Sequence, residues 1–440
     1  MLTVSTTPLD EWTARRLGVD RLTRPALERW QLDRLQEVFS WARERSPFYR
    51  RLYKHLSSGM PDALSGLPDL PFVEQSDLRD HGAELVCVSQ GDIDRVVTIP
   101  TSGSTGAPKR VWFTESDLEL TVDHFRHGMR ALVQPGERVL VLMPGPTPGS
   151  VGSLLRDALA RDGVEAEAYG FVDSCEHVAK RIEDYGADCL VGVPGQVLRL
   201  ARSRQGRAIP SGRIKSVLLS GDHVAGRLRA AIERAWGCTV FEHYGSTEIG
   251  LGGAVQCRAF AGLHVREADL LFEVVDPHTG EPRADGEQGE LVVTTLTRRG
   301  MPLVRFRTGD AAVHMSPGSC RCGSVLRCLE RVEGRLADVV DLGNGATLTM
   351  ADLDEAVYGQ DWTIGFSAEI TGKASDSRLV LHIEARETPP PRDLEDLTRS
   401  IEAIPSIRSG RVAVTVEVAG EGEDLLGPAK RRIRDARDAG

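Results

Sequence analysis

Short apolar runs that alternate with helix-like segments constrain most strongly how this chain can fold. A run such as residues 138–143 (RVLVLM), apolar on both faces, is typical of a strand buried in a parallel sheet. Helical spacing of apolar residues over 154–162 and 175–185 separates the runs. We therefore expect an α/β architecture with a mainly parallel sheet. Further strands of this series are predicted at 164–171, 189–193 and 214–220.

The pattern changes in the second half of the chain. Residues 270–275, 289–296 and 303–307 have the composition of strands, with Gly-rich turns and no long helix between them. This pattern predicts a β-rich subdomain over about 255–334. One helix start is also predicted locally, where Ser116 and Glu119 form a capping-box pattern that opens a helix reaching to about Leu132.

The last hundred or so residues form a third type of pattern. Strand-like segments at 378–385 and 411–418 flank a helix predicted at 393–404. We therefore expect a large N-terminal domain over 1–334 and a small α+β C-terminal domain over 335–440.

Size and charge restrict the class of protein. The chain has 440 residues, enough for two or three domains, and a net charge of −10 without a long basic block. Nucleic acid binding needs a concentrated positive face, so we expect no nucleic-acid partner. The N-terminus lacks a secretory pattern, and no apolar run approaches the roughly 18–20 residues of a membrane-spanning helix. A cytosolic protein without a membrane partner is predicted, and its oligomeric state is left open.

One Gly-rich loop has the groups that wrap a polyphosphate. Residues 101–109 (TSGSTGAPK) offer backbone N–H groups, small hydroxyls and a lysine cation. The spacing of a Walker A loop cannot be laid over it. Its flanks, 95–100 and 110–114, both look like strands, so the expected arrangement is strand–loop–strand. The alternative is a flexible, hydroxyl-rich turn without a ligand.

Two later segments carry side chains suited to a nucleotide. Residues 241–250 (FEHYGSTEIG) combine Tyr244, which can stack on a base, with Glu248, which can hold Mg²⁺ beside phosphate oxygens. Residues 305–310 (RFRTGD) place Asp310 at a strand end, where it can accept hydrogen bonds from ribose hydroxyls. Each segment alone is also compatible with an ordinary turn.

In this order the three segments resemble the adenylate-forming superfamily of acyl-CoA synthetases, peptide-synthetase adenylation domains and luciferases. Residues 34–53 (RLQEVFSWARERSPFYRRLY), residues 67–80 (LPDLPFVEQSDLRD) and the total length look like the phenylacetate–CoA ligase branch. The resemblance then extends over nearly the whole chain.

The resemblance implies roles for individual residues. Tyr244, followed by Gly245 in the turn, would stack on adenine, and Asp310 would bind the ribose. Thr247 would touch the α-phosphate and Glu248 would hold Mg²⁺. Arg335 would reach the nucleotide from the hinge. The β- and γ-phosphates of ATP would be held by Thr101, Ser102, Gly103, Ser104, Thr105, Gly106 and Lys109. The loop beside adenine would be Ser220, Gly221 and Asp222, although the family more often has Glu at the last position.

The implied activity is ATP-dependent attack of a carboxylate on the α-phosphorus, giving acyl-AMP and pyrophosphate, followed by transfer to CoA as a thioester. Three prolines and two glycines in residues 143–150, with 249–253 as a second pocket wall, suit a flat aromatic acid. Transfer of acyl-AMP to an amine or carrier protein is one alternative. A non-catalytic nucleotide- or acyl-binding relative is another.

Two departures from the family pattern concern the C-terminal region. Pro428 stands where the family has a catalytic lysine, and Lys430 lies two residues further on. Lys430 is either a displaced substitute for that lysine or a solvated surface charge. At the hinge, Ala337 stands where the family has Asp or Lys, with Asp338 next.

Cysteine and histidine spacing predicts a metal site. Cys257, His264, Cys320 and Cys322 make a Cys₃His set, which suits a closed, structural Zn²⁺ site. Some relatives in the phenylacetate–CoA ligase branch carry zinc at similar positions. Cys328 is a competing ligand, and reduced cysteines without metal are the alternative.

Overall fold

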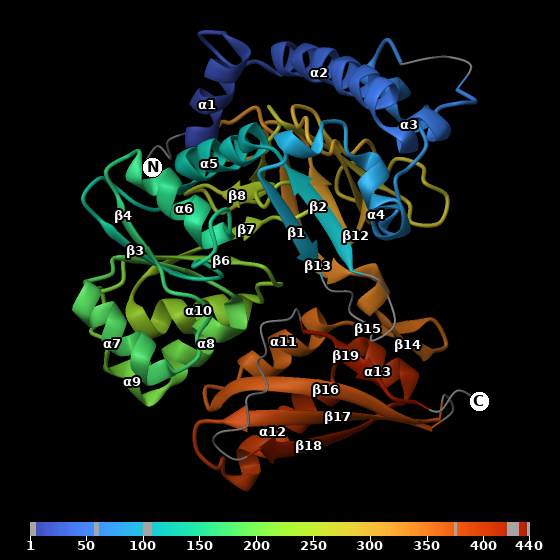
Figure 1. Ribbon diagram of the computed structural model, residues 1–440. Coiled ribbons are helices and arrows are strands. Elements are labelled where there is room, and N and C mark those ends of the chain that lie inside the picture. Colours follow the sequence, from blue (N-terminus) through green and yellow to red (C-terminus); the bar gives the residue numbers. More distant parts are fainter. Residues whose placement is uncertain (1–5, 57–60, 100–107, 374–375, 420–430, 438–440) are drawn as a thin grey trace. The chain divides into compact units, whose positions relative to one another are not determined.

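The computed structural model describes residues 6–56, 61–99, 108–373, 376–419 and 431–437 (Figure 1). The chain divides into two compact units. Unit 1 comprises Met1–Gln134, Thr147–Gly163 and His243–Val332. Unit 2 comprises Pro135–Pro146, Val164–Glu242 and Glu333–Gly440.

The helices of unit 1 begin and end at residues whose chemistry explains their limits. The long helix α2 is capped by the Thr23 hydroxyl, which accepts a hydrogen bond from Ala26 N. It ends at Arg45 because Pro47 disfavours helical backbone at Ser46, the residue before it. Ser46 then caps the next helix by accepting from Tyr49 N. The helices of unit 1 are α1 (Pro8–Leu17), α2 (Arg24–Arg45), α3 (Pro47–Leu52), α4 (Gln75–Asp80), α5 (Glu115–Met129) and α6 (Val151–Ala160), with 3₁₀ turns at Leu64–Asp69, Gly82–Leu85 and Gln90–Asp92.

An antiparallel hairpin flanks the Gly-rich loop. Strands β1 (Arg95–Ile99) and β2 (Lys109–Phe113) pair from Arg95 opposite Phe113 to Ile99 opposite Lys109. The predicted strand–loop–strand arrangement is therefore confirmed at both flanks, while residues 101–107 lie outside the described part of the chain.

The strands in the second half of unit 1 form the predicted β-rich region. They run in the order β10-β11-β12-β13-β9-β8-β7, and β10, β11 and β12 pair antiparallel. Leu263, Val265, Leu291 and Val293 belong to the buried apolar cluster of this sheet. The strands are β7 (Thr239–Tyr244), β8 (Ala254–Gln256), β9 (Leu263–Val265), β10 (Leu270–Val275), β11 (Gln288–Thr295), β12 (Phe306–Met315) and β13 (Cys328–Arg335), and the unit boundaries fall within β7 and β13.

Unit 2 contains the parallel strands that the apolar runs predicted. They lie in the order β6-β5-β3-β4, and each described pair is parallel. The strands are β3 (Arg138–Leu142), β4 (Glu165–Ala168), β5 (Cys189–Gly192) and β6 (Ser216–Ser220). The helices that accompany them are α7 (Cys175–Tyr185), α8 (Pro194–Arg202), α9 (Arg204–Ala208) and α10 (Gly226–Trp236).

The C-terminal part of unit 2 adds a four-stranded sheet in the order β18-β17-β16-β19. Strands β16 and β17 pair antiparallel, and the outer strands are parallel to their neighbours. The strands of this sheet are β16 (Thr363–Lys373), β17 (Asp376–Ala385), β18 (Ala413–Ala419) and β19 (Ile433–Asp435). Before them in the chain, β14 (Val340–Gly343) and β15 (Ala346–Leu348) form a separate antiparallel hairpin. The helices of this C-terminal part are α11 (Met350–Tyr358), α12 (Pro391–Glu402) and α13 (Pro405–Gly410), and they follow the 3₁₀ turn Leu336–Asp338.

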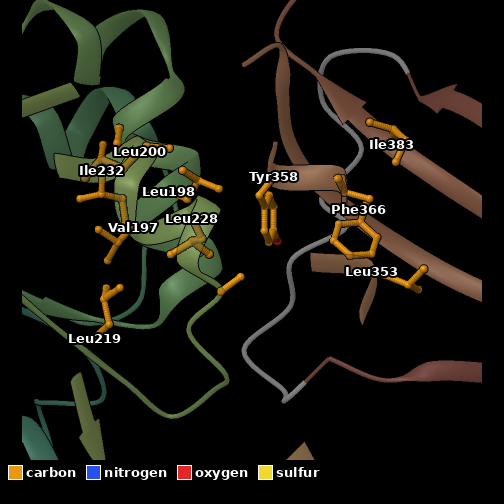
Figure 2. Close-up of a cluster of buried hydrophobic side chains, with 14 of the residues drawn as sticks. Val197, Leu198, Leu200, Leu219, Leu228, Ile232, Leu353, Tyr358, Phe366 and Ile383 are labelled. Atoms are coloured by element: carbon orange, nitrogen blue, oxygen red, sulfur yellow. The ribbon is translucent and has the colours of Figure 1, made fainter. Parts of the chain in front are cut away.

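The two parts of unit 2 share one apolar core (Figure 2). Leu228 and Ile232 of α10 belong to the same buried cluster as Leu353, Tyr358 and Phe366. Because both parts bury apolar side chains in this cluster, the hydrophobic effect stabilises their association.

Buried arginines add hydrogen bonds to this core. Arg202 donates to the carbonyls of Thr363 and Tyr358 over 2.6 and 2.8 Å. Arg431 donates to both carboxylate oxygens of Asp354, at 2.7 and 2.9 Å, and to Asp222 Oδ2 at 3.1 Å. Asp354 is fully buried, so its charge depends on this bidentate partner.

The α/β fold class predicted from the sequence is confirmed, and the differences concern element limits. The strand predicted at 164–171 ends at Ala168, because Gly170 adopts a φ of 113°. The strand predicted from residue 303 begins at Phe306, because Arg305 adopts a φ of 51°. Helix α5 starts two residues earlier than predicted, with Thr114 and Asp117 forming the capping box, and ends at Met129.

Division of the chain into domains at Gly334 and Arg335 remains a prediction. Within the described ranges, the helices include none that is long and apolar enough to cross a membrane.

Replacement of Arg431 tests the polar contact in unit 2. In Arg431→Ala, the carboxylate of Asp354 would stay buried without its bidentate partner, so we expect the free energy of unfolding to fall by about 3–5 kcal/mol. Denaturant unfolding, followed by tryptophan fluorescence, measures this change. Arg432→Ala is the matched control because Arg432 is exposed, and its effect should stay within about 0.5 kcal/mol. Equal stability of both variants would contradict a stabilising role for the contact.

Candidate active site

A buried ion pair joins two of the predicted nucleotide-binding segments. Lys109, the first residue of β2, places its Nζ 2.5 Å from Glu248 Oε1. Both residues are buried, with exposed fractions of 7% and 5%. In such surroundings a charge needs a partner, and each of these residues supplies the partner of the other.

Gln75 is a residue of this site that sequence reasoning missed. Its Oε1 accepts a hydrogen bond from Lys109 Nζ at 2.6 Å. Its Nε2 donates to the carbonyls of Arg307 and Thr308 at 3.0 and 2.9 Å. Gln75 therefore connects the lysine to the strand that carries Asp310. The signal was present, since Gln75 lies within the FVEQSDLR stretch that carries the family resemblance.

Tyr244 and Asp310, predicted to hold the adenosine, meet directly. The Tyr244 hydroxyl donates to Asp310 Oδ2 at 2.7 Å, and Asp310 N donates to Thr308 Oγ1 at 3.1 Å. Burial, followed by the nearby Asp310 charge, raises the pKa of Tyr244 well above its ordinary value. The hydroxyl therefore remains a donor, and the two side chains hold each other in place.

Tight backbone packing shapes the segment after Tyr244. A Cβ on Gly245 would lie 1.9 Å from the carbonyl oxygen of Leu251, so only glycine fits there. Gly253 N donates to Tyr244 O at 3.0 Å, and Leu251 itself adopts a φ of 66°. The chain thus folds back on itself and holds the segment containing Thr247, which is half-buried, and Glu248.

Arg298 and Asp117 support this segment, and sequence reasoning missed both. Arg298 donates to the carbonyls of Glu248 and Trp112 at 2.6 and 2.9 Å. Asp117 accepts from the backbone N–H groups of Arg299 and Gly300, each at 2.9 Å. The turn at 298–300 therefore positions Glu248 through its backbone. Arg298 belongs to no recognisable motif, and Asp117 lies in a helix-capping pattern that gave no indication of its contact with residues 299–300.

The remaining predicted nucleotide residues belong to unit 2. Ser220 ends β6, and Gly221 follows with a φ of 92° that favours glycine. Asp222 accepts from His223 N at 2.9 Å and from Arg431 at 3.1 Å. Arg335 is half-buried at the end of β13.

Several predicted residues lie outside the described part of the chain, so their roles stay predictions. These residues are Thr101, Ser102, Gly103, Ser104, Thr105, Gly106, Pro428 and Lys430.

The four predicted zinc ligands converge in unit 1. The ligand atoms of Cys257, His264, Cys320 and Cys322 lie within 4.8 Å of one another, and all four residues are buried. The sulfurs of Cys257 and Cys320 are 3.7 Å apart, and Cys322 Sγ is 3.3 Å from His264 Nε2. Tetrahedral zinc with Zn–S distances of about 2.3 Å would hold two sulfurs about 3.8 Å apart, so this donor set fits the metal.

Cys328 occupies a different position around His264. It lies opposite His264 in the pairing of β13 with β9, and its Sγ is 3.3 Å from Nδ1 rather than Nε2. The two ring nitrogens thus face different sulfurs. This geometry favours Cys328 as a hydrogen-bonding partner that orients the imidazole, in place of the competing ligand that the spacing allowed.

The hydrogen bond from Cys257 lowers the pKa of Cys322 to about 3, although burial opposes this change. A thiolate at Cys322 is the form that binds a metal.

Residues 65–297 match the family model described as AMP-binding enzyme. Phenylacetate-coenzyme A ligase of Thermus thermophilus is 30% identical over 73% of this chain and 73% of that protein. The protein of the same name from Escherichia coli is 28% identical over 82% of this chain and 83% of its own length. The chain therefore belongs to the family of AMP-binding enzymes, in its phenylacetate–CoA ligase-like branch.

Solved structures support the fold. The crystal structure of 2-hydroxyisobutyryl-CoA ligase in the postadenylation state, in complex with R3-HIB-AMP, matches with a TM-score of 0.79 and 20% identity. The match covers 93% of this chain and 89% of that one.

Replacement of Gln75 tests its connection to Lys109. Gln75→Leu removes the hydrogen bond to a charged group while keeping a similar side-chain volume, and such a bond contributes about 1.5–3 kcal/mol. We expect ATP to bind about tenfold to a hundredfold more weakly, as measured by titration calorimetry. Gln90→Leu, at an exposed position, is the control and should bind ATP normally. Unchanged affinity in Gln75→Leu would rule out this positioning role.

Proposed function

We propose that this chain uses ATP to activate a carboxylic acid, most suitably an aromatic one, as an acyl-AMP, and then transfers the acyl group to CoA. The observation that carries the proposal is the buried pair of Lys109 and Glu248, which joins the ends of two nucleotide-binding motifs. The similarity to phenylacetate-coenzyme A ligases supports the choice of acid and acceptor.

The chemistry requires two anions to approach each other. A carboxylate oxygen attacks the α-phosphorus of ATP, a new P–O bond forms, and the bond to the bridging oxygen breaks to release pyrophosphate. The thiolate of CoA then attacks the acyl carbon, and AMP leaves. Because charge neutralisation and alignment lower such barriers, cations and fixed hydrogen-bond donors are the main requirements.

Residues of unit 1 meet these requirements in the proposed reaction. Lys109 would neutralise the β- and γ-phosphates, with Gln75 directing its ammonium group. Tyr244 and Asp310 would hold the adenosine, and Thr247 would contact the α-phosphate. Glu248, an acidic ligand of the kind that Mg²⁺ prefers, would hold the metal, which supplies further charge neutralisation at the phosphates when bound.

We also propose that the Cys₃His cluster holds a structural Zn²⁺. Its four donors are buried and closely spaced, and both flanking strands, β9 and β13, pair through His264 and Cys328. The metal would therefore crosslink strand β9, the turn after β8 that holds Cys257, and the turn between β12 and β13 that holds Cys320 and Cys322. Its role is structural because the four donors complete a tetrahedral shell and leave no open position.

The activity is tested with the purified chain, ATP, Mg²⁺ and a panel of aromatic acids. We expect acid-dependent pyrophosphate release, and a CoA thioester, detected by mass spectrometry, when CoA is added. Lys109→Ala should lower kcat/KM for pyrophosphate release by about 100-fold to 1,000-fold, because one preorganised charge is lost. Lys180→Ala, at an exposed position of α7, should keep normal activity.

Failure to release pyrophosphate with any acid would contradict the proposed activation. Release that CoA leaves unconverted, with transfer to an added amine, would retain the adenylation and contradict CoA as the acceptor.

Metal analysis tests the cysteine cluster. We expect one equivalent of zinc per chain, lost in Cys320→Ser. Cys328→Ala should retain zinc but bind it about 10–100-fold more weakly, because an orienting hydrogen bond is removed. Cys175→Ser, remote from the cluster in sequence and on α7, should keep full zinc affinity. A zinc content that Cys320→Ser leaves unchanged would contradict the site, and complete loss in Cys328→Ala would make Cys328 a ligand.

A further inference from the structure

A pocket rich in arginine is lined by residues of α1 and α5. These two helices contact each other in unit 1 (Figure 1). Its volume is about 420 Å³, and pockets for small ligands usually span roughly 300–1,000 Å³. Arg15 and Arg16 of α1 and Arg126 of α5 line it, with Arg130 at the end of α5. Asp123 is the single carboxylate among the lining residues.

The arginine heads remain accessible while the wall behind them is buried. The side chains of Arg15, Arg16, Arg126 and Arg130 are 49%, 28%, 31% and 34% exposed. Trp12, by contrast, is only 2% exposed. The guanidinium groups can therefore contact a ligand from solvent without any change in the core.

Three of these arginines share their carboxylate partners, whereas Arg15 forms an ion pair with the exposed Glu11 of the same helix. Asp162 accepts from Arg126 Nε at 2.7 Å and from Arg130 Nε at 2.6 Å, so one negative charge serves two cations. Asp269 is likewise shared between Arg16 and the buried Arg266, at 2.5 and 2.8 Å. Asp162 and Asp269 each face two cations, so part of the positive charge of Arg16, Arg126 and Arg130 is left unbalanced.

Asp123 and His127, which also line the pocket, fix the side chains around them. The indole Nε1 of Trp12 donates to Asp123 Oδ2 at 2.6 Å, which fixes that carboxylate against the wall. Burial lowers the pKa of His127, which favours the neutral ring. Its Nδ1 lies 2.8 Å from the Asp123 carbonyl and must donate, so Nε2 accepts from Arg15 Nη2 at 2.8 Å. Arg15 is therefore held in a defined direction.

We propose that this pocket binds the phosphate groups of a ligand. Guanidinium groups present planar pairs of N–H donors that match phosphate oxygens, and several of them converge here. The phosphates could belong to CoA or to a free inorganic anion such as pyrophosphate. Binding of CoA rests on the proposed function, whereas binding of a free anion is independent of it.

Helix α5 connects this pocket to the candidate acyl-binding segment. Thr121 donates to the carbonyl of Gly250 at 2.8 Å, and Arg126 lies about 8 Å further along the helix. A ligand with phosphates in the pocket and a long arm directed along α5 would approach that segment, which favours CoA over the free anion.

Binding measurements on the full chain test the proposal. Titration calorimetry is performed with CoA, with dephospho-CoA, which lacks the 3′-phosphate, and with inorganic pyrophosphate, while ATP fills the nucleotide site. We expect Arg15→Gln and Arg130→Gln each to weaken binding about tenfold or more. Arg161→Gln is the matched control, since Arg161 pairs with Glu119 and does not line the pocket; it should bind normally.

The probes distinguish the two sources. Tighter binding of CoA than of dephospho-CoA, lost in both variants, identifies CoA. Pyrophosphate binding of equal strength, with the same loss, identifies a free anion. Absence of binding by every probe, or binding unaffected by both variants, overturns the proposal.

Acid-dependent pyrophosphate release is measured on the same preparations. We expect it to be unchanged in both variants. If release is absent in every preparation while the variants lose pyrophosphate binding, the pocket stands and the proposed function fails.

Discussion

The buried ion pair between Lys109 and Glu248 is the interaction on which the candidate site depends. It ties the end of the Gly-rich loop to the segment that follows Tyr244. Gln75 links the same lysine to the strand of Asp310, and Arg298 holds the backbone of Glu248. In the proposed reaction a triphosphate would compete with Glu248 for the cation, and a magnesium ion would compete with Lys109 for the carboxylate. The pair would therefore hold both groups ready for a ligand that carries phosphate and magnesium together.

The cysteine cluster and the shared core of unit 2 stabilise parts of the fold away from this pair. His264 of β9 and Cys328 of β13 lie opposite each other in the strand pairing. A zinc ion bound by the cluster would add its binding free energy to the stability of the β-rich region. In unit 2, Arg431 connects Asp354 with Asp222, which belongs to the predicted adenine loop. In the sequence, Arg431 directly follows the segment with Pro428 and Lys430.

Local patterns predicted much of the fold and site, and long-range contacts account for the rest. Apolar runs identified the parallel strands because a strand buried on both faces must be apolar along its length. Tyr244 and Asp310 were found from their motifs, and the structure brings them together. Gln75 could not be assigned a partner, since its contact with Lys109 depends on packing between separate elements. Likewise, the spacing of the cysteines could not show that Cys328 contacts Nδ1 of His264 while Cys322 contacts Nε2. The start of β12 was misjudged because the positive φ of Arg305 depends on its buried tertiary contacts.

A crystal structure with ATP, Mg²⁺ and a non-reactive acid analogue would test the role of the ion pair most directly. We expect Lys109 Nζ to move from Glu248 to the β- and γ-phosphate oxygens, and Glu248 to face the metal. The adenosine should contact Tyr244 and Asp310. A nucleotide bound elsewhere, with Lys109 and Glu248 still paired, would contradict the assignment of this site.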